Sequence, residues 1–112
     1  MYLSIIKIYP TVEMEHYIID VLESMKGPSA ANVDCLDCMI TAGTDNERRV
    51  ICYMEQWRIR EALDRHLRSA SYGRVLEAIE FSQLPPVILY YEMNVLGGLE
   101  LVKLARAGTP RH

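Results

Sequence analysis

The sequence predicts a single α+β domain in which a four-stranded antiparallel sheet carries helices on one face. The 112-residue length suits one compact domain. The hydrophobic period changes repeatedly along the chain between the spacing of strands and that of helices. Half of the residues are hydrophobic and 24% are charged, which is the balance of an ordinary globular protein and excludes a disordered chain.

The chain opens with a strand and a helix. Residues 2–9, YLSIIKIY, mix β-branched and aromatic side chains and end at Pro10, which predicts a strand closed by a turn. Apolar residues then recur at helical spacing over residues 11–25, with acidic residues in the first turn, where the helix dipole favours them. Gly27 and Pro28 predict the end of this helix.

The middle of the chain predicts a hairpin followed by two helices. Residues 33–41 and 49–56 are strand-like and flank a polar segment that contains turn-forming residues. Helical periodicity covers residues 58–68 and 72–82, and Ser71 is the expected N-cap of the second of these helices.

The last elements complete the topology. Two prolines precede a fourth strand at residues 87–95, and two glycines lead into a short helix over 99–107. The order is therefore βαββαβ, the ferredoxin-like arrangement, with a C-terminal helix added. We expect a ferredoxin-like domain over residues 1–96 and a C-terminal helix and tail over residues 97–112.

Apolar side chains occupy both faces of the first and last strands. A sheet with helices on one face should be polar on the other, and a bare apolar face favours aggregation. We therefore expect a second copy of the chain to cover the open sheet face in a two-fold homodimer. The alternative is that the C-terminal helix folds over this face. One set is Leu3, Ile5, Tyr9, Val87, Leu89, Tyr91 and Met93; the opposite set is Ile6, Ile8, Ile88 and Tyr90.

Charge and hydropathy exclude several classes of partner. The net charge of −3 and the absence of a basic stripe give no reason to bind nucleic-acid phosphates or an anionic membrane. The N-terminal segment lacks the basic start and cleavage site of a signal peptide, and no apolar run approaches the roughly 18 residues of a membrane span. We expect a cytoplasmic protein.

The chain has an odd number of cysteines, so they cannot all pair in disulfides. They are Cys35, Cys38 and Cys52. On an extended strand, positions 35 and 38 point to opposite faces, whereas redox-active pairs usually precede a helix N-terminus. No second Cys or His pair stands at metal-binding spacing. We expect reduced structural thiols and no metal site.

The only tryptophan, Trp57, and a histidine, His66, are the candidate site. His66 shares the inward stripe of its helix, so it is either a buried neutral imidazole or a general base in a pocket. Trp57 lies where a strand passes into a helix, where it either plugs the core or lines a cleft together with Glu55, His66 and Tyr72. The inward stripe is Ile59, Ala62, Leu63, His66 and Leu67.

These residues resemble the antibiotic biosynthesis monooxygenase-like domains of the dimeric α+β barrel superfamily. The resemblance covers roughly residues 2–95. It rests on a Glu-x-Trp pattern, a short helix containing Glu-Ala-Leu, and a His-Leu-x-Ser segment followed by an aromatic residue. In this chain these are Glu55, Trp57, Glu61-Ala62-Leu63, His66-Leu67, Ser69 and Tyr72.

The resemblance implies a homodimer with one pocket in each subunit. Several such proteins oxidise aromatic polyketides or quinols with O₂ and no cofactor, since the deprotonated substrate is itself the reductant. It implies catalytic roles for His66, Trp57 and Tyr72, and the same pocket would bind a small aromatic or quinone-like molecule. We expect substrate contacts from Glu55, Tyr53, Ser69 and Tyr90.

Departures from the family pattern reduce the number of reactions that the resemblance allows. The first strand lacks the asparagine of relatives that act on aromatic polyketides or haem, and Asp34 replaces a common glycine. Leu76 stands where haem-degrading relatives carry their iron-ligating histidine, so no haem is expected. The alternatives are a non-catalytic ligand-binding or structural dimer, or an isomerase or lyase on the same scaffold.

Overall fold

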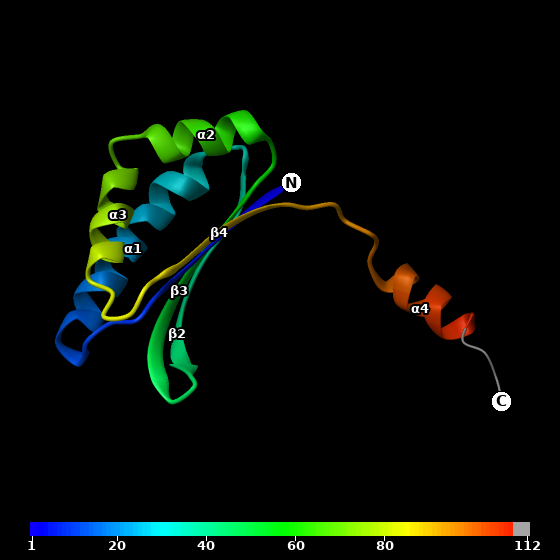
Figure 1. Ribbon diagram of the computed structural model, residues 1–112. Helices are drawn as coiled ribbons and strands as arrows, with labels where there is room; N and C mark the ends of the chain where they lie inside the picture. Colours follow the sequence, from blue (N-terminus) through cyan, green and yellow to red (C-terminus); the bar gives the residue numbers. More distant parts are fainter. Residues whose placement is uncertain (109–112) are drawn as a thin grey trace.

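The computed structural model describes residues 1–108 and confirms the predicted α+β fold (Figure 1). The strands form one antiparallel sheet in the order β2-β3-β1-β4, and α1, α2 and α3 cover one of its faces. The last four residues of the predicted tail lie outside the described residues. The elements are β1 (Tyr2–Ile8), α1 (Val12–Ala31), β2 (Cys35–Asp45), β3 (Arg48–Trp57), α2 (Arg60–Arg68), α3 (Tyr72–Glu80), β4 (Val87–Glu92) and α4 (Leu99–Ala107).

The core lies between the sheet and the three helices. Alternate residues of the two central strands, β1 and β3, point toward the helices and are fully or almost fully buried. The buried sheet residues meet apolar residues of α1 and α3, and burial of each large side chain stabilises the fold by roughly 1.5–3 kcal/mol. On the sheet these residues are Ser4, Ile6, Ile8, Ile51, Tyr53, Glu55 and Trp57.

The first helix is longer than predicted, and this difference shapes the site. Its Thr11 N-cap accepts the Met14 N–H at 3.1 Å, but the helix continues through Gly27 and Pro28 to Ala31. Glycine and proline disfavour a helix interior by about 1 and 3 kcal/mol, so tertiary packing must offset this. Met25 and Ser29 are buried on either side of the Gly-Pro pair and supply that packing.

The second and third helices are shorter than predicted, and Ser71 is not the side-chain cap. The backbone of Ser71 is already helical and its side chain makes no capping hydrogen bond. Instead Ser69 Oγ accepts the Tyr72 N–H at 3.3 Å and donates to the His66 carbonyl at 2.6 Å. Ser69 therefore links the end of α2 to the start of α3.

A β-bulge corrects the predicted orientation of two cysteines. The register shifts between Cys35 and Asp37, so that Cys35 pairs with Trp57 and Cys38 pairs with Glu55. Since Trp57 and Glu55 point toward the helices, both thiols lie on that face rather than on opposite faces. Beyond the bulge, β2 and β3 pair as far as a tight two-residue turn at 46–47.

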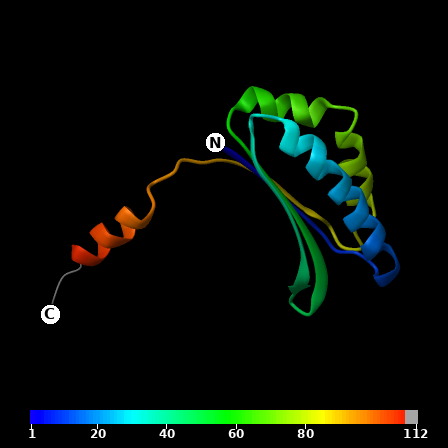
Figure 2. The ribbon, with the colours of Figure 1, turned by 180° about the vertical axis from the view of Figure 1, so that it is seen from behind.

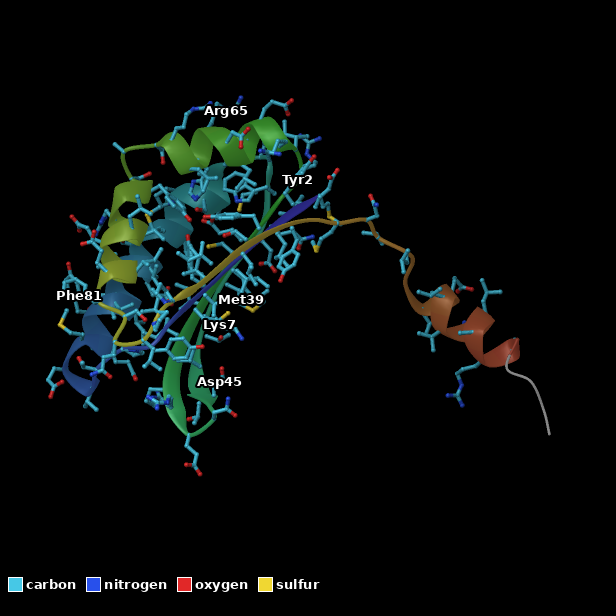
Figure 3. All side chains as sticks on the ribbon, viewed as in Figure 1. Tyr2, Lys7, Met39, Asp45, Arg65 and Phe81 are labelled. Carbon is cyan, nitrogen blue, oxygen red and sulfur yellow. The ribbon has the colours of Figure 1, made fainter. Side chains whose placement is uncertain are left out.

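The opposite face of the sheet is open and apolar. Met39 is 42% exposed, and Leu89 and Tyr91 are each 44% exposed. Figure 3 shows Met39 and Lys7 on the side of the sheet away from the helices. The apolar residues of this open face are Leu3, Ile5, Met39, Val50, Cys52, Met54, Val87, Leu89 and Tyr91.

The C-terminal segment does not cover this open face. The fourth strand ends at Glu92 rather than at residue 95, and residues 93–98 run away from the sheet (Figures 1 and 2). Every residue of α4 is exposed. In this structure the helix thus leaves the open face uncovered, contrary to the alternative considered from the sequence.

Candidate functional site

A buried carboxylate is the centre of the candidate site. Glu55, on β3, is fully buried, and one of its oxygens, Oε2, accepts three hydrogen bonds. Tyr53 donates at 2.6 Å, His66 Nε2 lies at 2.8 Å and Ser29 donates at 3.4 Å. When Glu55 is ionised its oxygen can only accept, so Nε2 of His66 then carries the hydrogen and Nδ1 is the nitrogen without one.

Aromatic rings hold the imidazole from both sides. The ring centroid of His66 lies 4.7 Å from that of Trp57 with a 35° tilt, and 5.1 Å from that of Tyr72 in an edge-to-face arrangement. Such pairs contribute roughly 0.5–1.5 kcal/mol beyond their buried area. With only 9% of its side chain exposed, His66 is oriented by Glu55 and by both rings.

One side of this cluster faces a cavity between α1 and α2, which we name the α1–α2 cavity. Its volume is about 200 Å³, and Trp57, His66 and Ser69 form part of its wall. The continuation of α1 past Pro28 supplies Ser29 and Asn32 to the same wall. The complete lining is Met25, Pro28, Ser29, Asn32, Trp57, Arg65, His66, Ser69 and Ser71.

Tyr72 does not line that cavity. It is 3% exposed, and its hydroxyl lies 3.1 Å from that of Tyr90 on β4. Tyr90 instead faces a second cavity of about 250 Å³ between α2 and β4, lined by Tyr2, Arg60, Leu63, Asp64, Leu67, Tyr90, Tyr91 and Glu92. The residues expected at one site therefore do not line a single cavity: Trp57 and His66 line the α1–α2 cavity, Tyr90 lines the second, and Tyr72 lines neither.

Burial keeps the phenol and thiol groups around Glu55 in their neutral forms. Burial, together with the adjacent Glu55, raises the pKa of the Tyr53 phenol well above its usual range. Burial and the hydrogen bond to Tyr90 raise the pKa of Tyr72. Burial also raises the pKa of Cys38, whose thiol donates to the Tyr53 oxygen at 3.7 Å. Tyr53 thus keeps its proton at neutral pH and donates it to Glu55.

Three buried polar atoms have no hydrogen-bond partner among the described residues. They are the second oxygen of Glu55 (Oε1), the indole nitrogen of Trp57 and the hydroxyl of Ser4. Ser4 pairs directly with Glu55 in the sheet register and with Tyr90 on its other side. Buried polar groups usually find partners, so these atoms mark a polar region inside an otherwise apolar core.

Sequence reasoning found part of this arrangement. His66 contacts both Trp57 and Tyr72, Ser69 lines the same cavity as His66, and Glu55, held by Tyr53, hydrogen-bonds His66. Reasoning from the sequence missed Ser29, Asn32 and Arg65. Ser29 lies in the part of α1 beyond its predicted end, and Asn32 is the C-cap of that helix. Arg65 lies outside the inward stripe of α2, so helical spacing gave no sign of it.

No group of three or more potential metal ligands is found within residues 1–108. Over the same residues, no helix is both long and apolar enough to cross a lipid bilayer.

The comparisons with known proteins identify the fold. No family model matches the chain, and no curated protein matches it. Solved structures do match, and they confirm that the chain has the fold of these monooxygenase-like domains.

Three solved structures illustrate the similarity. The Rv0793 protein from Mycobacterium tuberculosis is 19% identical, with a TM-score of 0.67 over 86% of this chain and 98% of its own. A proposed antibiotic biosynthesis monooxygenase from Deinococcus radiodurans is 17% identical, with a TM-score of 0.70 over 87% and 100%. Another, from Nitrosomonas europaea, is 15% identical, with a TM-score of 0.68 over 83% and 98%. At these identities the likeness establishes the fold alone.

Proposed function

We propose that the protein binds a small single-ring phenol or quinol in the α1–α2 cavity and oxidises it with O₂ without a cofactor. The observation that carries this proposal is the Glu55–His66 hydrogen bond of 2.8 Å, held against Trp57 at the wall of the cavity. The cavity volume of about 200 Å³ limits the ligand. A dry cavity of ~150 Å³ admits benzene, so one substituted ring fits here and a polycyclic aromatic does not.

His66 would act as the proton acceptor. Glu55 holds Nε2, so Nδ1 is free to take the proton of a phenolic hydroxyl. The Glu55 carboxylate then stabilises the imidazolium, and Tyr53 fixes the carboxylate from the other side at 2.6 Å. In this scheme His66 is a catalytic residue, whereas Glu55 and Tyr53 position it.

The oxidation balances without a further reductant. A quinol and O₂ give a hydroxylated quinone and water, so the substrate supplies all four electrons. One oxygen atom forms the new C–O bond and the other leaves as water. The protein's part is to remove the first proton and to hold the electron-rich anion in a shaped pocket.

We also propose that the working form is a homodimer that buries the open sheet face. That face presents apolar side chains from all four strands, and α4 of the same chain leaves them uncovered. An apolar face of this size is typical of an interface. A second copy supplies the same face under two-fold symmetry.

A non-catalytic role is the second candidate, and the packing of Tyr72 favours it. Tyr72 is buried between His66 and Tyr90, so of the three residues with expected catalytic roles only two face the α1–α2 cavity. A Glu-His-Tyr cluster can also serve to specify a buried core. The two candidates differ in whether a bound ring is oxidised.

The experiment uses Trp57 as an internal reporter. It is the only tryptophan, so its indole N–H gives one cross-peak in a ¹⁵N correlation spectrum. Titration with phenol, catechol and hydroquinone under nitrogen should shift this peak saturably in the wild type. His16→Ala, an exposed histidine on α1, is the matched control and should behave as the wild type. A peak that no ring compound moves at millimolar concentration would exclude the proposed site. Binding without O₂ consumption would select the non-catalytic candidate.

A further inference from the structure

The C-terminal segment is an exposed arm rather than part of the folded body. Residues 93–98 run away from the sheet, and α4 stands clear of the other helices in both views (Figures 1 and 2). The arm is apolar, since Val95 is 71% exposed and Leu96 is 85% exposed. Its base is anchored by backbone hydrogen bonding between Met93 and Met1.

The helix of the arm is amphipathic. Leu101 and Leu104 lie one turn apart on one side and are 45% and 71% exposed. Lys103 and Arg106 lie on the other side. A nine-residue helix is marginal in water on its own, so its apolar side must be buried against something for the helix to persist.

A second copy of this chain has complementary charge. Residues 1–92 contain fourteen acidic and nine basic residues, whereas residues 93–112 contain one acidic and three basic residues. A basic arm is thus attached to an acidic body, and α4 of the arm stands clear of the helices of that body (Figure 1). The arm also leaves directly from β4, whose Leu89 and Tyr91 belong to the open sheet face, so it begins at the edge of the proposed dimer interface.

We propose that the arm crosses to the second protomer of the homodimer and that α4 buries Leu101 and Leu104 against the partner's body. Two-fold symmetry makes the exchange reciprocal, so each body is covered by the other's helix. This inference rests on the dimer proposed above but not on its chemistry. It adds a second contact to the one between sheets.

The first experiment measures hydrogen exchange of the full-length protein at micromolar and at much lower concentrations. The amides of residues 99–107 should be protected where the protein is dimeric and should lose this protection as it dissociates. A dimer with unprotected α4 amides would overturn the arm exchange while leaving the dimer intact. A wild type that sediments as a monomer would overturn the dimer itself. Protection that appears only with anionic lipid vesicles would assign the helix to a membrane surface instead, and would contradict the proposal.

The second experiment compares two substitutions on the same helix. Leu101→Glu places a charge on the apolar side, whereas Leu99→Glu places the same charge two residues away on a different side. Because each dimer would bury two copies of Leu101, its loss should weaken dimerisation by at least about 100-fold. Leu99→Glu should change the dissociation constant by less than about threefold. Equal effects of the two substitutions would refute the assigned side of the helix.

Discussion

Truncation of Glu55 to alanine should destabilise the protein by about 2–4 kcal/mol. The substitution leaves three donors without this acceptor: the hydroxyl of Tyr53 at 2.6 Å, Nε2 of His66 at 2.8 Å and the hydroxyl of Ser29 at 3.4 Å. All three are almost entirely buried, and an unsatisfied buried donor costs roughly 1–3 kcal/mol. Removal of a buried carboxylate also relieves its own desolvation, which lowers the net loss from the sum of these costs.

Urea denaturation at one fixed protein concentration measures this loss, since dimerisation makes stability depend on concentration. Glu55→Gln keeps an acceptor oxygen and the side-chain shape, so it should cost about half as much. Glu61→Ala, at an exposed position on α2, is the control and should stay within about 0.5 kcal/mol of the wild type. If Glu55→Ala were no more destabilising than Glu61→Ala, the hydrogen-bond network around His66 would not be what holds this part of the core.

Three further predictions concern pH, thiol reactivity and assembly. The raised pKa of Tyr53 means that the folded state keeps a proton which the unfolded state releases above about pH 10. The free energy of unfolding should therefore fall above that pH by up to about 1.4 kcal/mol per pH unit. Tyr53→Phe should remove the contribution of this tyrosine to the slope. An unchanged slope would contradict the buried phenol. Burial raises the pKa of Cys35 to about 11, so iodoacetamide at pH 8 should modify this thiol at least about tenfold more slowly in the native protein than in urea. Equal rates would show that the thiol is accessible and ionises normally. Leu89→Glu on the open sheet face should shift sedimentation toward the monomer. Leu76→Glu on α3 is the control, since the wild-type side chain is 52% exposed, and it should leave sedimentation unchanged. A dimer that tolerates Leu89→Glu would show that the interface lies on another surface.

The strand and helix order could be predicted from the sequence because periodicity is a local property. The inward position of His66 followed from helical spacing, and its contacts with Trp57 and Tyr72 followed from the motif that these residues share. The continuation of α1 through Gly27 and Pro28 could not be predicted, because burial on both sides of the pair outweighs local propensity.

The orientation of the cysteines and the shape of the site depended on tertiary detail. The bulge between Cys35 and Asp37 changes the face of the sheet on which a thiol lies, and the alternation of residues in the sequence does not predict this bulge. Ser29 became part of the site only because α1 extends over Glu55. The placement of Tyr90 in one cavity and of His66 in another likewise depends on how the helices pack on the sheet.

Oxygen uptake by the purified protein with a hydroquinone that shifts the Trp57 indole signal tests the central claim most directly. The wild type and His16→Ala should consume O₂ at rates proportional to protein concentration, in the ratio of one O₂ per hydroxylated quinone. His66→Ala should lose the catalysed rate by about 10²- to 10⁴-fold, the usual contribution of a general base. If His66→Ala consumed O₂ as fast as the wild type, His66 would not be the proton acceptor, and if the wild type consumed none, the pocket would bind without catalysing this reaction.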